Sequence, residues 1–171
     1  MKHIEDTLVW KAIVKTNQAI LVITSISVMT ILVAGVFVRY VLKSDIFGIE
    51  EILVICAMWM YWMAGVHASY QNNHLRADIF DNVIKSKKAK RIFSIAVQII
   101  TIFGIALFAK WGIDFAAWNI KVGSTTPGHR MPMLYSQIPI TISFIMMLFY
   151  SLYHLYRTIF PIKPDNKEVS N

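Results

Sequence analysis

The chain has 171 residues, of which 56% are hydrophobic and only 16% are charged, and its mean hydropathy of +0.53 excludes an ordinary soluble domain. The net charge of +7 does not indicate a nucleic-acid partner, because the positive residues flank long apolar blocks and form no patch of their own. The single cysteine, Cys56, excludes an intramolecular disulfide framework.

Four apolar blocks follow one another along the chain, and each is long enough to cross a bilayer core of about 30 Å as a helix. The first is too long for the apolar region of a secretory signal, and no Ala-x-Ala site follows it, so we expect it to be retained. The sequence therefore predicts an all-α integral membrane protein. It has one membrane domain over residues 1–163 and a short polar cytoplasmic tail over 164–171, with transmembrane helices at 16–38, 52–70, 92–109 and 131–153.

The distribution of positive charge predicts the orientation. Twelve of the 17 Lys and Arg residues lie in the N-terminal segment, the loop between the second and third spans, and the C-terminal tail. Because Lys and Arg favour the cytoplasmic side, and four spans return the chain to the side on which it started, we expect both termini to be cytoplasmic.

An amphipathic segment follows the third span. Trp111, Phe115 and Trp118 recur at helical spacing, and charged residues occupy another face. This pattern predicts a helical extension at the outer membrane interface, where indole rings prefer to lie. The Gly- and Pro-containing segment 123–132 should then end the helix.

None of the four predicted spans carries Asp, Glu, Lys or Arg in its middle. An autonomous ion-coupled pump, or a small exporter that relies on an embedded Glu, requires such a residue. The sequence also shows no nucleophile beside a general base, so we predict no catalytic residue, no metal site and no cofactor. The acidic pair Glu50 and Glu51 opens the second span, where it can cap the helix, and either carboxylate could pair with Arg39.

Two histidines leave an alternative open. His67 and His154 lie near the cytoplasmic ends of the second and fourth spans, so they could share a depth in the membrane. Facing histidines in a four-helix bundle can ligate haem, which would make the chain the membrane anchor of a redox enzyme. The simpler interpretation is that each ring reaches water at the interface.

Two further features have a functional and a structural interpretation. The aromatic run at residues 58–63, MWMYWM, lies well inside the bilayer and could form a partner surface or pack within the chain. Pro139 should kink the fourth span, either for gating or as a packing device.

Several of these features occur in one order along the chain. Arg39 is followed by EEILVICAMWMYWMAGVHASY (50–70), then NNHLRADIFD (72–81), and finally MPMLYSQIP (131–139). Over residues 18–160 this order resembles the DctQ-type small membrane subunit of the tripartite ATP-independent periplasmic transporters, the TRAP family. The positions that match the family are Arg39, Glu50, Glu51, Trp59, Gly65, His74 and Asp78.

The resemblance implies a non-catalytic subunit in a bacterial inner membrane, in a sodium-coupled system that imports an organic acid such as a C4-dicarboxylate, a keto acid or a sialic acid. The implied partners are a large multi-spanning TRAP membrane subunit, which the small subunit braces, and a periplasmic substrate-binding protein, which it helps to dock. The matching positions would then serve in subunit contact or in structure, with Glu51 at the outer face. His74 and Asp78 would shape the turn before an interfacial amphipathic helix at residues 79–90, whose lysines, including Lys87 and Lys88, would face anionic headgroups.

Overall fold

The computed structural model describes residues 8–44, 47–71 and 87–159, and the regular structure in these ranges is helical. The helices are α1 (Leu8–Tyr40), α2 (Ile49–Tyr70), α4 (Lys87–Val122) and α5 (Leu134–Ile159). All four are long and apolar enough to cross a membrane. This confirms the prediction of an all-α chain with four helices that can span a bilayer.

Helices α1 and α4 extend past the predicted spans. The predicted spans begin or end at a formal charge, such as Lys15 or Lys110, whereas both helices continue through these residues. Lysine is a good helix former, and its long stem allows the ammonium group to reach water. Segment 110–121, predicted as a helical extension, therefore belongs to α4. That helix ends at Val122, before Gly123 in the left-handed region (φ 64°).

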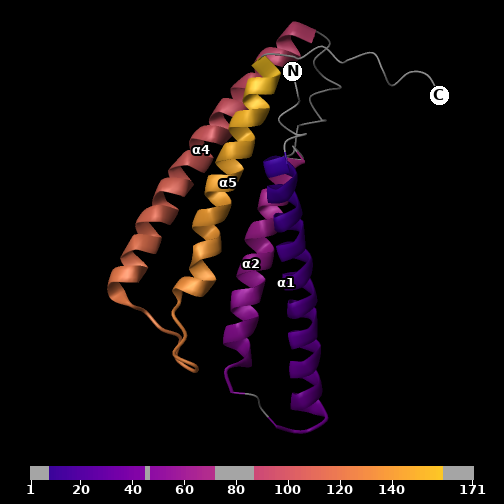
Figure 1. The fold of residues 1–171 in the computed structure, drawn as a ribbon, viewed down its shortest axis with the longest axis vertical. Coiled ribbons are helices and arrows are strands. Elements are labelled where there is room, and N and C mark those ends of the chain that lie inside the picture. Colours follow the sequence, from indigo (N-terminus) through magenta and orange to yellow (C-terminus); the bar gives the residue numbers. More distant parts are fainter. Residues whose placement is uncertain (1–7, 45–46, 72–86, 160–171) are drawn as a thin grey trace, which may run out of the picture.

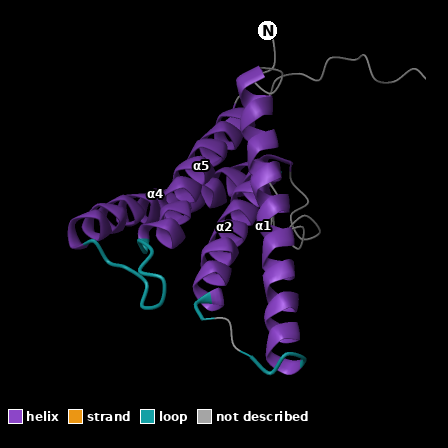
Figure 2. Ribbon diagram, turned by 60° about the horizontal axis from the view of Figure 1, so that its bottom comes forward, coloured by secondary structure: helices purple, strands orange, loops and turns teal. Residues whose placement is uncertain are grey.

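The four helices form an open layer. Along the layer α1 contacts α2, α2 contacts α5, and α5 contacts α4, so that α1 and α4 lie at the two edges (Figures 1 and 2). The connections from α1 to α2 and from α4 to α5 lie at the same end of the molecule, which we call the loop end (Figure 1). An open layer leaves each edge helix with only one main helical neighbour.

The core is small and lies between α1, α2 and α5. Trp10, Val66 and Tyr150 are buried, and Tyr70 and Tyr153 pack against them. The indole of Trp10 contacts four aromatic rings at centroid distances of 4.8–6.3 Å, which fixes the first turns of α1 against α2 and α5. Most other large apolar side chains on the described helices are partly or fully exposed, a distribution that suits contact with lipid or with another membrane protein.

Some predicted features lie outside the described residues. They are His74, Asp78, most of the predicted interfacial helix at 79–90, and the tail at 164–171. Lys87 and Lys88 are the first two residues of α4. The interfacial helix and the cytoplasmic location of the termini stay predictions.

Candidate functional site

The loop end gathers the best-defined polar contacts of the described structure around Glu51, in the first turn of α2. Its carboxylate accepts hydrogen bonds from the Thr126 hydroxyl at 2.7 Å, the Gly128 backbone N–H at 2.5 Å and the His129 backbone N–H at 2.9 Å. The His129 imidazole Nδ1 lies 3.5 Å from the same carboxylate, which is only 13% exposed. The loop between α4 and α5 is thereby fastened onto α2, in a contact that we call the Glu51 clasp.

The loop itself is preorganised for this contact. Thr125 and Pro132 form an isolated antiparallel bridge, and the Thr126 N–H donates to the Met131 carbonyl at 2.8 Å. The turn between them directs successive backbone N–H groups inward, an arrangement that binds anions. A Cβ atom on Gly128 would lie 2.8 Å from the Glu51 Oε1 atom, so glycine permits the close approach.

A second glycine, Gly48, lies against the same α4–α5 loop. Gly48 precedes α2 with φ 76°, and a Cβ atom there would collide with the His129 ring. Both the backbone conformation and the available space therefore require glycine at this position. The predicted role of Glu51 in subunit contact stays untested. What the sequence interpretation missed is its attachment to residues 126–129.

Arg39 pairs with Glu50 across the short connection between α1 and α2. A guanidinium nitrogen of Arg39 lies 3.7 Å from the Glu50 carboxylate, and the two side chains are 58% and 80% exposed. Of the two carboxylates considered from the sequence, Glu51 is occupied by the clasp and Glu50 pairs with Arg39. An exposed pair of this kind contributes about 0–1 kcal/mol to stability.

Trp59 bonds to the backbone of α5. Its indole Nε1–H donates to the Tyr135 carbonyl at 3.0 Å. In an uninterrupted helix that carbonyl would accept from the N–H of residue 139, but residue 139 is proline and has no N–H. Trp59 therefore satisfies the carbonyl that Pro139 leaves without its usual helical donor, which is one way a proline is accommodated inside a membrane helix.

The aromatic run at 58–63 divides between packing and exposure. Trp59 bonds to α5, and the ring of Trp62 packs against Phe144 at a centroid distance of 5.1 Å. Tyr61, by contrast, is 68% exposed. The two tryptophans thus serve packing within the chain, and Tyr61 remains accessible to lipid or a partner.

Gly65, on α2, leaves room for the end of the Met147 side chain of α5. A Cβ atom at this position would lie 2.5 Å from the terminal methyl carbon of Met147. A side chain at position 65 would therefore have to displace the end of the Met147 side chain. Gly65 is therefore a packing residue of the contact between α2 and α5.

The predicted interface residues lie on the accessible surface of α4. Trp111 and Trp118 are 58% and 55% exposed, and the rings of Phe115 and Trp118 stack at a centroid distance of 6.3 Å. Their exposure fits contact with headgroups. Their depth in a membrane stays a prediction.

The two histidines make contacts within the protein. The His154 Nε2 atom lies 3.1 Å from the Tyr70 carbonyl oxygen, and the His67 Nε2 atom lies 2.8 Å from the Gln71 side-chain nitrogen. The first contact joins α5 to α2, and the second lies within one helical turn. Neither contact favours the haem-anchor alternative.

Comparison with known proteins identifies the family. Residues 28–160 match the family model described as "Tripartite ATP-independent periplasmic transporters, DctQ component". A comparison with curated proteins gives no match. The matched region includes residues 28–40 of α1, less than half of that helix, and all of α2, α4 and α5, and so contains the Glu51 clasp and the Trp59 contact. The chain belongs to the DctQ family and is a small, non-catalytic membrane component of a TRAP transporter.

Proposed function

We propose that this chain is the small permease subunit of a sodium-coupled importer of an organic acid, such as a C4-dicarboxylate, a keto acid or a sialic acid, in a bacterial inner membrane. The family match is the observation that carries the proposal. The transport chemistry would lie in the large membrane subunit, and this chain would brace that subunit in the bilayer.

The distribution of charge along the helices supports a bracing role. Helices α1, α2 and α5 carry Asp, Glu, Lys and Arg only near their ends, and in α4 the apolar stretch 92–109 precedes Lys110 and Asp114. A protein that couples ions on its own places ionisable side chains at mid-membrane. The open layer also leaves broad apolar faces for a large partner subunit and for lipid.

The loop end supports the docking part of the proposal. If both termini are cytoplasmic, this end faces the periplasm, where the binding protein arrives. The Glu51 clasp attaches the α4–α5 loop to α2, with Arg130 exposed and the His129 side chain 43% exposed. The exposed positive charge of Arg130 suits an acidic surface on a binding protein, and attachment of the loop to α2 lowers the entropic cost of association.

Co-purification tests the bracing role. The tagged chain, expressed in its host and extracted in a mild detergent, should retain a large, very hydrophobic subunit with many spans, identified by mass spectrometry. Recovery of a flavoprotein or an iron–sulfur subunit instead would reject the proposal and restore the redox alternative.

Substitution of the loop tests docking separately. Arg130→Glu should weaken association of the binding protein with the membrane complex by about tenfold, the scale of one reversed charge at an interface. Lys121→Glu, a reversal at the end of α4 outside the loop, is the matched control. Equal effects of the two changes, or none, would reject docking at this loop while leaving the bracing role intact.

Site-directed labelling tests the orientation. In a variant with Cys56→Ala, a cysteine introduced at Ser124 should react with a membrane-impermeant maleimide in intact cells whose outer membrane is permeable. A cysteine introduced at Ser170 should react only after the inner membrane is opened. The reverse pattern would contradict cytoplasmic termini.

A further inference from the structure

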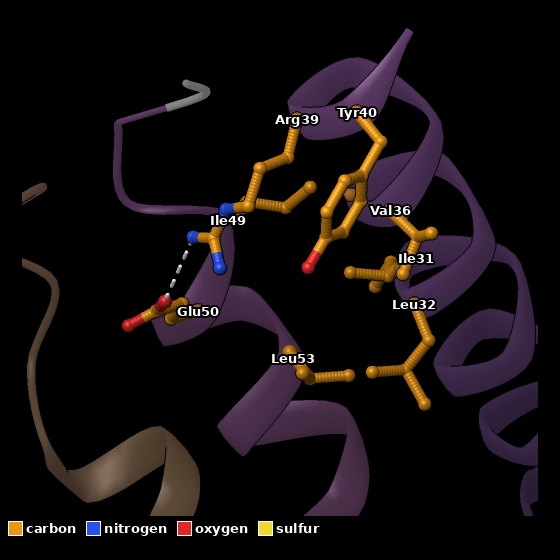
Figure 3. Close-up of a pocket in the computed structure, with 9 residues that line it drawn as sticks. Ile31, Leu32, Val36, Arg39, Tyr40, Ile49, Glu50 and Leu53 are labelled. Carbon is orange, nitrogen blue, oxygen red and sulfur yellow. Dashed lines mark ion pairs between the residues drawn. The ribbon is translucent and has the colours of Figure 1, made fainter. Parts of the chain in front are cut away.

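A pocket opens between α1 and α2 at the loop end, with a volume of about 250 Å³. This volume is below the ~300–1,000 Å³ typical of pockets that enclose a whole small ligand, so the pocket suits one part of a longer molecule. Its lining is apolar on the side away from the loop and polar at the mouth (Figure 3), and comprises Ile31, Leu32, Gly35, Val36, Arg39, Tyr40, Ile49, Glu50 and Leu53.

The mouth carries one positive and one negative group. The Arg39 guanidinium and the Glu50 carboxylate lie 3.7 Å apart, and both side chains are largely exposed. Figure 3 shows the Arg39 side chain reaching toward Glu50, with the Tyr40 hydroxyl directed into the pocket. A ligand at this mouth therefore meets a cation, an anion and a hydroxyl group side by side.

The polar and apolar parts of the pocket lie at the depths of a lipid headgroup and of an acyl chain. Arg39 lies in the last turn of α1 and Glu50 in the first turn of α2, so both lie at an end of a span, where headgroups are found. At a rise of about 1.5 Å per residue, Ile31 lies roughly 12 Å farther along α1 toward the middle of the membrane. The pocket thus runs from headgroup level into the hydrocarbon region.

We propose that this pocket binds a glycerophospholipid whose zwitterionic headgroup ends in a primary ammonium, such as phosphatidylethanolamine. The phosphate would lie beside Arg39, the ammonium would donate to Glu50, and one acyl chain would lie along Leu32, Val36 and Leu53. An anionic headgroup would be repelled by Glu50, and a quaternary ammonium has no N–H to donate to it.

Native mass spectrometry of the purified full chain tests headgroup selection. The delipidated protein is incubated with equimolar phosphatidylethanolamine, phosphatidylcholine and phosphatidylglycerol that carry the same acyl chains. We expect phosphatidylethanolamine to be retained about threefold to fivefold more than either competitor, the scale of one exposed charged contact. Glu50→Gln should abolish its advantage over phosphatidylcholine, and Arg39→Gln should lower retention of all three lipids. Equal retention by the native chain would overturn the proposal.

A steric variant locates the binding in the pocket. A Cβ atom on Gly35 would lie at an ordinary 3.8 Å from Ile49 Cδ1, and Gly35 lines the pocket, so we expect the longer side chain of Gly35→Leu to occupy the pocket. Gly104→Leu is the matched control, because a Cβ atom at Gly104 meets nothing within 4 Å. We expect Gly35→Leu to lower phosphatidylethanolamine retention at least threefold relative to Gly104→Leu. Equal retention by the two variants would assign the lipid to another surface and overturn the proposal.

Discussion

Helix α5 meets α2 on one side and α4 on the other, and the helices differ in the large side chains that they bury. In α2 and α5 the large buried side chains include Met63, Val66 and Tyr150, and hydrogen bonds from Trp59 to the Tyr135 carbonyl and between His154 and the Tyr70 carbonyl join the two helices. The contact with α4 likewise includes two interhelical hydrogen bonds, from Thr141 to the Gly112 carbonyl at 2.8 Å and from Gln98 to Thr158 at 3.2 Å, but α4 buries no large apolar side chain among the residues whose exposure the structure describes.

The difference has a physical consequence. In α4, among residues whose exposure the structure describes, the buried ones are Ala109, Gly112 and Asn119, while many large apolar side chains of the same helix are exposed. Hydrogen bonds between membrane helices contribute little on average, about 0.6 kcal/mol, because the separated helices find other partners. We infer that the contact between α2 and α5 stabilises the fold, and that α4 offers its apolar face to lipid or to the large subunit.

The largest expected effect comes from breaking the Glu51 clasp, which fastens the α4–α5 loop onto α2. Glu51→Ala leaves three donors without their charged acceptor and should lower the free energy of unfolding by about 2–4 kcal/mol. Thermal unfolding in detergent measures this loss, and trypsin should cleave after Arg130 faster in the variant.

Glu50→Ala is the matched control for the clasp. The Glu50 side chain is 80% exposed, so its removal should change stability by less than about 0.5 kcal/mol. If the two alanine variants unfolded at the same temperature and were cleaved at the same rate, the clasp would have no structural role.

Overpacking the contact between α2 and α5 should cause the second-largest loss of stability. Gly65→Leu forces a larger side chain against Met147 and should lower the free energy of unfolding by about 1–3 kcal/mol. The same change at Gly104, on the open part of α4, should be neutral or slightly stabilising, because leucine favours helix more than glycine does. Comparable losses in the two variants would remove the distinction between the contacts.

The Trp59 hydrogen bond should have a smaller effect. Trp59→Phe keeps most of the ring but removes the donor to the Tyr135 carbonyl, which should cost about 1 kcal/mol of unfolding free energy. Pro139→Ala restores a backbone N–H that can donate to that carbonyl, so the cost of Trp59→Phe should be smaller in the Pro139→Ala background. A double-mutant cycle of thermal stabilities measures this coupling, and strict additivity would contradict it.

The smallest effect is expected at the contact between α4 and α5. Thr141→Val removes the donor to the Gly112 carbonyl and should cost about 0.6 kcal/mol, measured by the same thermal unfolding. A loss larger than that of Gly65→Leu would reverse the comparison between the two contacts.

The helices could be predicted from the sequence because lipid permits long apolar blocks and short charged connections in only a few arrangements. Their ends could not be placed by formal charge alone, since α1 includes Lys15 and α4 includes Lys110. Because the predicted first span begins only after Lys15, it leaves out Trp10, which is 6% exposed and lies in the core. Hydropathy alone carries no information about a core residue close to a terminus.

The contacts between helices were harder to predict. Glu51 and its loop partners are more than 70 residues apart in sequence, and a Pro-Gly turn indicates inward N–H groups without saying which carboxylate they bind. Pro139 likewise indicates an unpaired carbonyl at Tyr135, but only the packing of α2 on α5 identifies Trp59 as its donor.

The most direct test of the account is transport by reconstituted liposomes. The chain alone, the large subunit of the same host alone, and the two together are each supplied with the binding protein, a sodium gradient and the organic acid that this binding protein recognises. We expect accumulation against a gradient only when both membrane subunits are present. Accumulation by this chain alone would contradict a non-catalytic small subunit that braces a separate transport protein.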